Sequence, residues 1–166
     1  IPTKYIPAVE KGIIETLKEG VLAGYKVVDL KVRLYDGSFH TVDSSDMAFK
    51  IAGSMAFKKA FMESKPIFLE PIYEVEVKVP EEFMGDVMGD LSGRRGKILG
   101  MDTEGAFQLI RARAPLAELY RYSTSLRSLT TGRGMHRRKF VGYEEVPADI
   151  AEKIVQESKD AKQKQD

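Results

Sequence analysis

The chain has 166 residues, 43% of them hydrophobic, and its 26 Lys and Arg nearly balance its 25 Asp and Glu. This hydrophobic content excludes disorder over most of the length, and no apolar run approaches the roughly 20 residues that span a bilayer. The absence of cysteine excludes disulfides, thiolate chemistry and cysteine–zinc sites. Because the chain begins at Ile1 and has no signal peptide, we expect a piece of a longer cytoplasmic protein without a membrane partner.

The N-terminal part predicts a small helix–strand–helix unit. Apolar residues at helical spacing indicate a first helix that ends at Gly20 or Gly24. Apolar and polar residues then alternate over 28–35, which predicts a half-buried strand. Acidic and hydroxyl side chains at 43–46 would cap a second helix that runs to about Glu63. The buried face of that helix would hold Met47, Ile51, Met55 and Ala56.

This unit, placed at residues 1–69, is not a closed domain. A single strand leaves both of its edges without hydrogen-bonding partners. We therefore expect the strand to pair with a segment N-terminal to this sequence or with another molecule, through dimerisation or strand exchange.

Residues 70–144 predict a closed domain. After two prolines at the boundary, the order of elements is strand, helix, strand, strand, helix, strand. This split β-α-β-β-α-β order is typical of a ferredoxin-like sandwich, with a four-stranded antiparallel sheet and two helices on one face, so the fold class is α+β. The strands are expected at 72–79, 96–102, 107–114 and 134–142, and the helices at 82–91 and 116–129.

A last helix is predicted over 145–160. It would place Ile150, Ile154 and Val155 on one apolar side. Residues 161–166 are polar and are expected to form a flexible tail.

His40 is the first candidate functional residue. It lies in a loop between the predicted strand and the next helix, beside Gly37, Ser38 and Phe39. The nearby serines suit turns and caps better than nucleophilic catalysis, and the only other histidine lies far along the chain. A contact with a base or a ribose is the chemistry that remains for an exposed histidine, and a plain surface histidine is the ordinary alternative.

Arg94 and Arg95 form a second candidate site. They follow a predicted helix and are bracketed by glycines that allow a close backbone approach. Their planar guanidinium groups suit bidentate contact with phosphate. The structural alternative is pairing with Asp86 and Asp90 of the preceding helix.

A second basic run covers 131–139 and includes Arg133 and Arg137. Alternation along the last strand would place Arg137 and Arg138 on opposite sheet faces. The whole stretch 94–139 holds eleven Lys or Arg and three acids. This asymmetry indicates either a basic face for a polyanion or an ordinary solvated surface.

No catalytic or metal site is predicted. The sequence has no GxxxxGK[ST] phosphate loop, no nucleophile placed beside a base and no cluster of metal ligands. It also lacks the aromatic strand signature of an RNA-recognition motif.

Several long strings of residues carry a family resemblance. They are Tyr5–Gly12, Leu34–Gly53, Met84–Met101, Pro115–Leu119 and Leu126–Gly134. In this order they closely resemble bacterial translation elongation factor G, from residue 1 to about residue 155. The resemblance implies the second half of that protein's domain IV, its whole domain V, and a C-terminal helix that returns to pack on domain IV.

In that family an N-terminal GTPase unit, which holds GTP and Mg²⁺, drives the movement of tRNA and mRNA on the ribosome. The resemblance therefore implies ribosomal RNA, tRNA and mRNA as partners and no cofactor in this part of the protein. The residues that match the tip of domain IV, which contacts the tRNA–mRNA duplex in the decoding region, are Gly37, Ser38, Phe39 and His40. The candidate contacts to ribosomal RNA are Arg94, Arg95, Lys97, Arg133 and Arg137.

Two departures separate the chain from the family pattern. The stretch Met135–Phe140 is basic where the family is neutral to acidic, and Ser125 replaces a usual Asp. They leave open a diverged paralogue that acts in ribosome recycling. Two more functions stay open as hypotheses: a ribosome-protection protein that displaces an antibiotic, and a ligand-binding or protein-interaction module built on the ferredoxin-like half.

Overall fold

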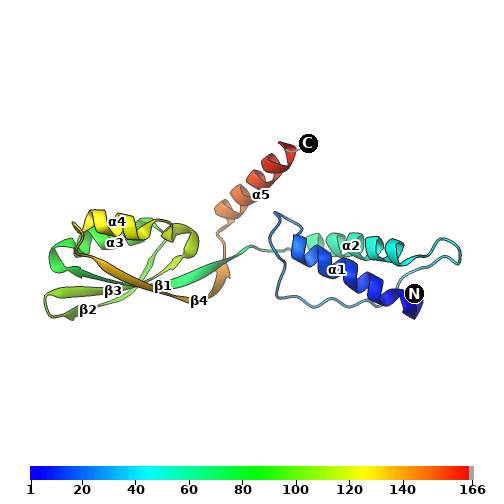
Figure 1. Cartoon of the computed structure of the whole chain (residues 1–166), viewed down its shortest axis with the longest axis horizontal. Coiled ribbons are helices and arrows are strands. Elements are labelled where there is room, and N and C mark those ends of the chain that lie inside the picture. The colour runs from blue at the N-terminus through cyan, green and yellow to red at the C-terminus, as the bar shows by residue number, and fades with distance from the viewer. Residues whose placement is uncertain (165–166) are drawn as a thin grey trace. The chain divides into compact units, whose positions relative to one another are not determined.

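The computed structural model describes residues 1–164 and divides into two compact units. Unit 1 comprises Ile1–Ile67 and the segment that begins at Pro147, and unit 2 comprises Phe68–Val146. The division falls two residues from the limits expected at 69 and 144. Figure 1 shows the elements of both units.

Unit 1 contains a short 3-10 turn, η1 (Thr3–Tyr5), and two helices in contact, α1 (Ile6–Glu19) and α2 (Asp46–Glu63). Helix α1 ends at Gly20, whose φ of 79° lies in the left-handed region, so the predicted stop is confirmed. The Ser45 Oγ accepts a hydrogen bond from the Ala48 N–H at 3.1 Å, which confirms the predicted cap of α2.

The backbones of α1 and α2 approach closely at two glycines. A Cβ placed on Gly12 would lie 2.1 Å from the carbonyl O of Lys50, and one on Gly53 would lie 2.9 Å from the carbonyl O of Val9. The buried Thr16 hydroxyl of α1 shares a hydrogen bond of 2.7 Å with the Ser54 hydroxyl of α2. The helix pair therefore depends on small residues at its line of contact.

The predicted buried face of α2 is wrong. Its buried residues are Phe49, Gly53 and Phe57. The four residues predicted to be buried are exposed: Met47, Ile51, Met55 and Ala56. Both sets recur at helical spacing. Helix α1 packs against the face that contains Gly53, because a glycine lets the α1 backbone approach closely and a methionine would not.

The predicted strand at 28–35 is also wrong in this structure. Between α1 and α2, the described residues form no strand. Leu30, Val32 and Leu34 line an apolar groove of about 780 Å³ together with residues of α1 and α2. Lys31 and Arg33 line the same groove, so the alternation does not sort this segment into a buried and an exposed side. A ladder also needs a partner strand, and unit 1 supplies none among its described residues. Dimerisation or strand exchange through this segment stays a prediction.

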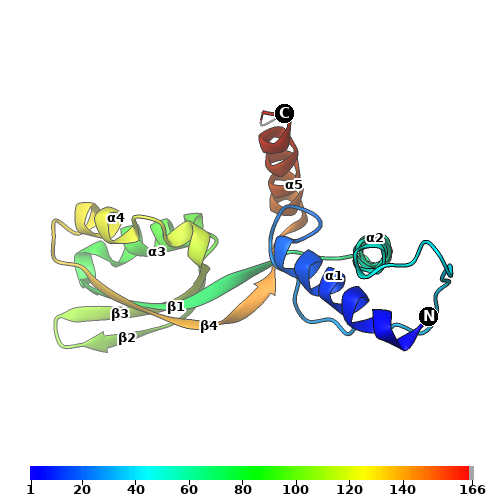
Figure 2. The same ribbon diagram turned by 45° about the vertical axis from the view of Figure 1, so that its right-hand side comes forward.

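Unit 2 is a four-stranded antiparallel sheet in the order β2–β3–β1–β4. Helices α3 and α4 lie on one face of it in both views (Figure 1, Figure 2). This arrangement confirms the predicted fold class. The elements are β1 (Leu69–Pro80), η2 (Glu81–Phe83), α3 (Met84–Gly93), β2 (Lys97–Glu104), β3 (Phe107–Pro115), η3 (Leu116–Leu119), α4 (Tyr122–Leu129) and β4 (Met135–Glu145).

The core of unit 2 lies between the sheet and its two helices. Alternate residues of β1, Val75, Val77 and Val79, are fully buried and meet Leu91 of α3 and Leu126 of α4. The residues between them point to the opposite face, which is therefore left to polar side chains.

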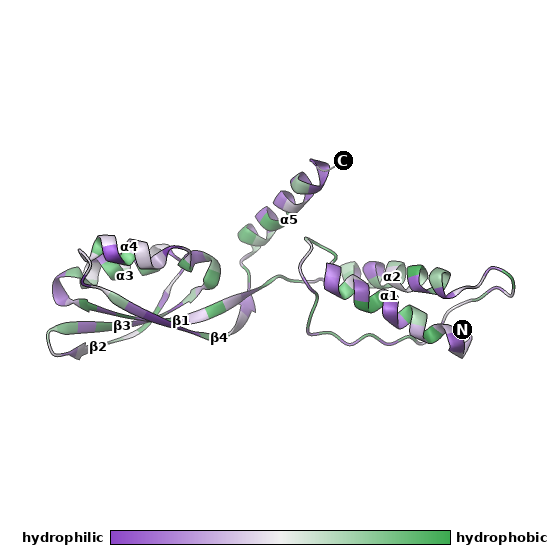
Figure 3. Cartoon of the chain, viewed as in Figure 1, coloured by the Kyte–Doolittle hydropathy of each residue, from purple (hydrophilic) through white to green (hydrophobic). Residues whose placement is uncertain are grey.

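Helix α5 (Ala148–Gln163) follows unit 2 in the chain. None of its described residues is buried, and Ile150, Ile154 and Val155 are partly exposed. Figure 3 shows hydrophobic residues in its first half and hydrophilic ones towards its end. Its return onto unit 1 stays a prediction. So does the flexible tail at 161–166, which begins within α5 and whose last two residues lie outside the described residues.

Candidate nucleic-acid interface

The loop at 36–44 in unit 1 is braced where it meets α2. The His40 N–H donates to the Ser44 Oγ at 3.0 Å, and this hydroxyl donates back to the His40 carbonyl. The Tyr5 hydroxyl donates to the Ser44 carbonyl at 3.1 Å, and the Tyr5 ring stacks on Phe49 with centroids 4.5 Å apart. The C-terminal end of the loop is therefore tied to η1, and η1 in turn packs on α2.

The four predicted tip residues are all exposed, as is the rest of the loop up to Asp43. Phe39 is 57% exposed, and the side chain of His40 is 66% exposed. The Nδ1 of His40 lies 3.3 Å from a carboxylate oxygen of Asp43, and the Gly37 N–H donates to Asp36 Oδ1 at 2.7 Å. Gly37 and Ser38 also line the apolar groove. The loop presents an imidazole and a phenyl ring to solvent, which are groups suited to contact with bases.

Arg94 is held inside unit 2. Its Nε donates to Asp90 Oδ2 at 2.9 Å, and its Nη1 donates to the Glu118 carbonyl at 2.7 Å. Its Nη2 donates to the Ser125 hydroxyl at 2.8 Å, and the guanidinium lies 5.1 Å from the centroid of the Tyr122 ring. Only 18% of the side chain is exposed. This geometry favours the structural alternative, with Asp90 as the partner.

Arg95 is paired as completely. Its Nη1 and Nη2 donate to the two carboxylate oxygens of Glu70 at 2.7 and 2.8 Å, and its Nε donates to Glu118 Oε1 at 2.9 Å. The hydrogen bonds that Arg95 donates to Glu70 are the main cause that raises the pKa of Arg95, and its hydrogen bond to Glu118 adds to this effect. An RNA contact by Arg94 or Arg95 stays a prediction, and their geometry favours pairing within the unit.

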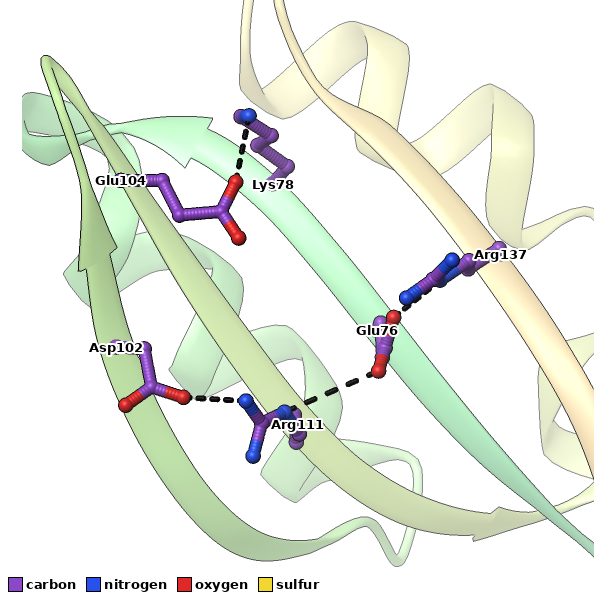
Figure 4. A network of polar contacts seen from close by, with 6 residues as sticks. All are labelled: Glu76, Lys78, Asp102, Glu104, Arg111 and Arg137. Carbon is purple, nitrogen blue, oxygen red and sulfur yellow. Dashed lines mark hydrogen bonds and ion pairs between the residues drawn. The ribbon is translucent and has the colours of Figure 1, made fainter.

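The open face of the sheet carries a network of alternating charges (Figure 4). Glu76 of β1 stands between Arg137 of β4, which it pairs with directly, and Arg111 of β3 at 3.8 Å. Arg111 also pairs with Asp102 of β2. The six residues of the network are Glu76, Lys78, Asp102, Glu104, Arg111 and Arg137. Arg137 is therefore neutralised by a neighbour, although its side chain is 81% exposed.

Arg133 and Lys97, the other two predicted contacts of unit 2, differ in their surroundings. Arg133 pairs with Glu82 and lies 4.8 Å from the centroid of the Phe83 ring. Exposed ion pairs of this kind are worth only about 0–1 kcal/mol, so a phosphate could replace the carboxylate. Lys97 is exposed at the start of β2. Over the described residues it has no ion pair, and neither do four further cations of unit 2: Arg121, Arg127, Arg138 and Lys139.

Strand β4 divides its basic residues between the two faces as predicted. Arg137 is opposite Glu76 on the open face, whereas Arg138 is opposite the buried Val75. His136 lies on the same side as Arg138, edge-on to the Tyr122 ring with centroids 5.0 Å apart. Burial, followed by the positive charge of Arg138, lowers the pKa of His136.

Sequence reasoning missed the partners that hold the two adjacent arginines. Glu70 and Glu118 lie 25 and 23 residues from Arg95 in the chain, too far for any local spacing rule to find. The available signal was compositional, since Glu118 is one of only three acids in the basic stretch 94–139.

Residues 1–164 contain no group of three or more His, Asp or Glu placed to hold a metal ion. Within the same residues, no helix combines the length and the apolar character needed to cross a bilayer.

Comparison with known proteins gives concordant matches to both units. Residues 1–65 match the family model "Elongation factor G, domain IV", and residues 67–154 match "Elongation factor G C-terminus". Elongation factor G of Aquifex pyrophilus is 56% identical over 157 residues, which are 95% of this chain and 22% of that protein. A crystal structure from Thermus thermophilus matches with a TM-score of 0.79 and 51% identity, over 96% of this chain and 24% of that one. The chain thus spans less than a quarter of the length of these relatives.

Proposed function

Because the chain belongs to the elongation factor G family and contains that family's domain IV and C-terminal regions, we propose that it is the ribosome-contacting part of a translational GTPase. In this proposal it promotes the movement of tRNA and mRNA during polypeptide elongation in the cytoplasm. The part described here binds RNA and catalyses no reaction itself. GTP and Mg²⁺ belong to the GTPase domain of the whole factor.

The exposed, braced loop at 36–44 is the observation that carries this proposal. A loop that follows a tRNA–mRNA duplex needs exposed side chains that can contact nucleobases, and it needs a rigid attachment to the rest of the protein. His40 and Phe39 are the exposed side chains. The hydrogen bonds of Ser44 and Tyr5 make the attachment rigid.

We place the second contact, to ribosomal RNA, on unit 2. Lys97 is exposed and without an ion pair among the described residues, so a phosphate would meet it without competition. Arg133 and Arg137 are exposed and would exchange a carboxylate for a phosphate. All three offer donors to phosphate oxygens, which position a protein on RNA without reading its sequence.

The proposal is tested with His40→Ala in the intact factor. We expect the movement of tRNA and mRNA on the ribosome to slow about tenfold, equivalent to roughly 1.4 kcal/mol, while ribosome-dependent GTP hydrolysis changes less than about twofold. Val42→Ala is the matched control, because it truncates another exposed side chain of the same loop, 78% exposed. Equal slowing by both variants, or a collapse of GTP hydrolysis with His40→Ala, would contradict the assigned role.

A further inference from the structure

A shallow pocket lies on unit 2 where η3, the start of α4 and strand β4 meet. Its volume is about 440 Å³. Two arginines from separate elements face it: Arg121 immediately precedes α4, and Arg138 is in β4 on the helix-covered side of the sheet. The pocket is lined by Leu116, Ala117, Leu119, Tyr120, Arg121 and Arg138.

These two arginines differ from most others of the unit. Six arginines of unit 2 pair with an Asp or Glu: Arg94, Arg95, Arg111, Arg113, Arg133 and Arg137. Neither Arg121 nor Arg138 has a carboxylate within ion-pair distance among residues 1–164. Their charges are therefore left for a partner outside the chain.

Aromatic rings hold both guanidinium groups in place. The Arg121 guanidinium lies 5.2 Å from the centroid of the Tyr120 ring, and that of Arg138 lies 5.7 Å from the centroid of the Tyr73 ring. A guanidinium that stacks on a ring keeps the N–H donors at its edge available for an anion. The positive charge of Arg138 also reaches His136, whose pKa it helps to lower after burial.

Tyr120 adds a feature that a free phosphate would not use. Its ring is 72% exposed and lines the same pocket as the two arginines. An exposed aromatic ring beside cations is the arrangement on which bases of single-stranded nucleic acid stack while their phosphates are neutralised.

We propose that this pocket binds an unpaired RNA segment, with Arg121 and Arg138 on a phosphate and Tyr120 against a base. The proposal rests on the proposed function only in that a ribosome would supply the RNA. It adds a contact separate from the loop at 36–44 and from Lys97, Arg133 and Arg137. Of the basic residues of β4, this assigns a role to Arg138, which lies on the helix-covered side of the sheet.

The backbone at Arg121 allows a test that does not risk unfolding. Arg121 has a φ of 54°, in the left-handed region that glycine adopts without strain. Arg121→Gly should therefore keep or raise the melting temperature while it removes the charge. A binding loss with unchanged stability would belong to the side chain and not to the fold.

The experiment measures binding of a fluorescein-labelled oligouridylate to the 166-residue chain by anisotropy, over a series of salt concentrations. We expect the pair Arg121→Gly and Arg138→Ala to weaken binding about tenfold. It should also reduce the slope of log K against log salt by about 1.4, the value for two contacts to a single strand. The matched control is Arg111→Ala with Arg113→Ala, which removes two positive charges from the open face.

Equal weakening by both double variants would show that the oligouridylate binds through the overall positive charge of unit 2 and not at this pocket, and would overturn the proposal. No change with the pocket variant would overturn it as well. Either result leaves the role of the loop at 36–44 intact, because His40→Ala on the ribosome tests that role independently.

Tyr120→Leu separates RNA from free phosphate as the ligand. We expect it to weaken oligouridylate binding about threefold or more, within the range of stacking on one base. The affinity of the pocket for inorganic phosphate should fall less than this, because both guanidinium groups remain. If Tyr120→Leu leaves oligouridylate binding unchanged, the pocket is an anion site and the RNA proposal is wrong.

Discussion

Units 1 and 2 hold their elements together by different means. Unit 2 closes around eleven buried residues, and each of its strands pairs with another strand of the unit. Unit 1 has two helices in contact at Gly12 and Gly53, beside an apolar groove and a segment patterned like a strand. The comparison teaches that an alternating pattern decides which side of a segment is apolar, whereas a sheet also requires neighbours that the pattern cannot supply.

The largest change in stability is expected at the contact between α1 and α2 in unit 1. A Cβ in Gly12→Ala would lie 2.1 Å from the Lys50 carbonyl O, so the helices must separate, at a cost of about 3 kcal/mol in the free energy of unfolding of unit 1. Amide hydrogen exchange, read separately for α1, α2 and the strands of unit 2, measures this loss.

Gly89→Ala in α3 is the matched control for that prediction. No atom lies within 4 Å of the Cβ that it would add, so helix propensity alone should stabilise unit 2 by about 0.5–1 kcal/mol. Unchanged protection of the α1 and α2 amides in Gly12→Ala would show that the helix contact is looser than the structure has it.

The second effect concerns the arginine that ties unit 2 together. Arg94→Ala removes three hydrogen bonds and leaves Asp90 without its partner, so we expect unit 2 to lose about 2–3 kcal/mol. Arg94→Lys should lose less, because it keeps the charge but not the planar fork. Urea unfolding followed by circular dichroism measures both. A loss below about 0.5 kcal/mol for Arg94→Ala would instead return this residue to the candidates for RNA contact.

These two cases also show how far the sequence could reach. The order of elements in unit 2 was predictable because each strand carries its own alternation and its partners follow within the same unit. The buried face of α2 was not, since two sets of residues share helical spacing and only the contact with α1 chooses between them.

The candidate sites follow the same rule. The exposed loop around His40 could be predicted because it depends on a local turn and cap. The environment of Arg95 depends on Glu70 and Glu118, which reach it only through the tertiary fold. The pocket of Arg121 and Arg138 likewise joins residues from separate elements, so neither stood out in the sequence beyond its charge.

The third effect is a dependence of the stability of unit 2 on pH. Burial and Arg138 lower the folded pKa of His136 below the ordinary value of about 6.5. Above that value the histidine is neutral in both states and contributes no dependence. As the pH falls below it, the unfolded chain takes up the proton first, so the free energy of unfolding decreases until the pH passes the folded pKa.

Thermal unfolding between about pH 8 and pH 5 measures this decrease. His136→Gln should remove the histidine's share of it, and Arg138→Ala should reduce that share because the second cause of the lowered pKa is gone. The carboxylates titrate alike in all three proteins and serve as the internal baseline. The same slope in His136→Gln and in the unchanged chain would mean that His136 is more open to solvent than the structure indicates.

The smallest effect tests whether a buried polar group of unit 2 lacks a hydrogen-bond partner. The Tyr122 hydroxyl is buried and has no hydrogen-bond partner among the described residues, and burial raises the pKa of this phenol, with the charge of Asp90 adding to it. Tyr122→Phe keeps the ring against Arg94 and His136 and removes only the oxygen. A buried hydroxyl without a partner loses its hydrogen bonds to water and gains none in the protein. We therefore expect unit 2 to keep its stability or gain up to about 1 kcal/mol in urea unfolding.

Tyr120→Phe is the control, because Tyr120 is 72% exposed. Its stability should stay within about 0.5 kcal/mol of that of the unchanged chain. A loss of more than about 1 kcal/mol in Tyr122→Phe alone would mean that the hydroxyl finds a partner in solution. The buried hydroxyl of unit 2 would then have a hydrogen-bond partner, so the contrast with unit 1, whose strand-like segment has no partner strand among the described residues, would be complete.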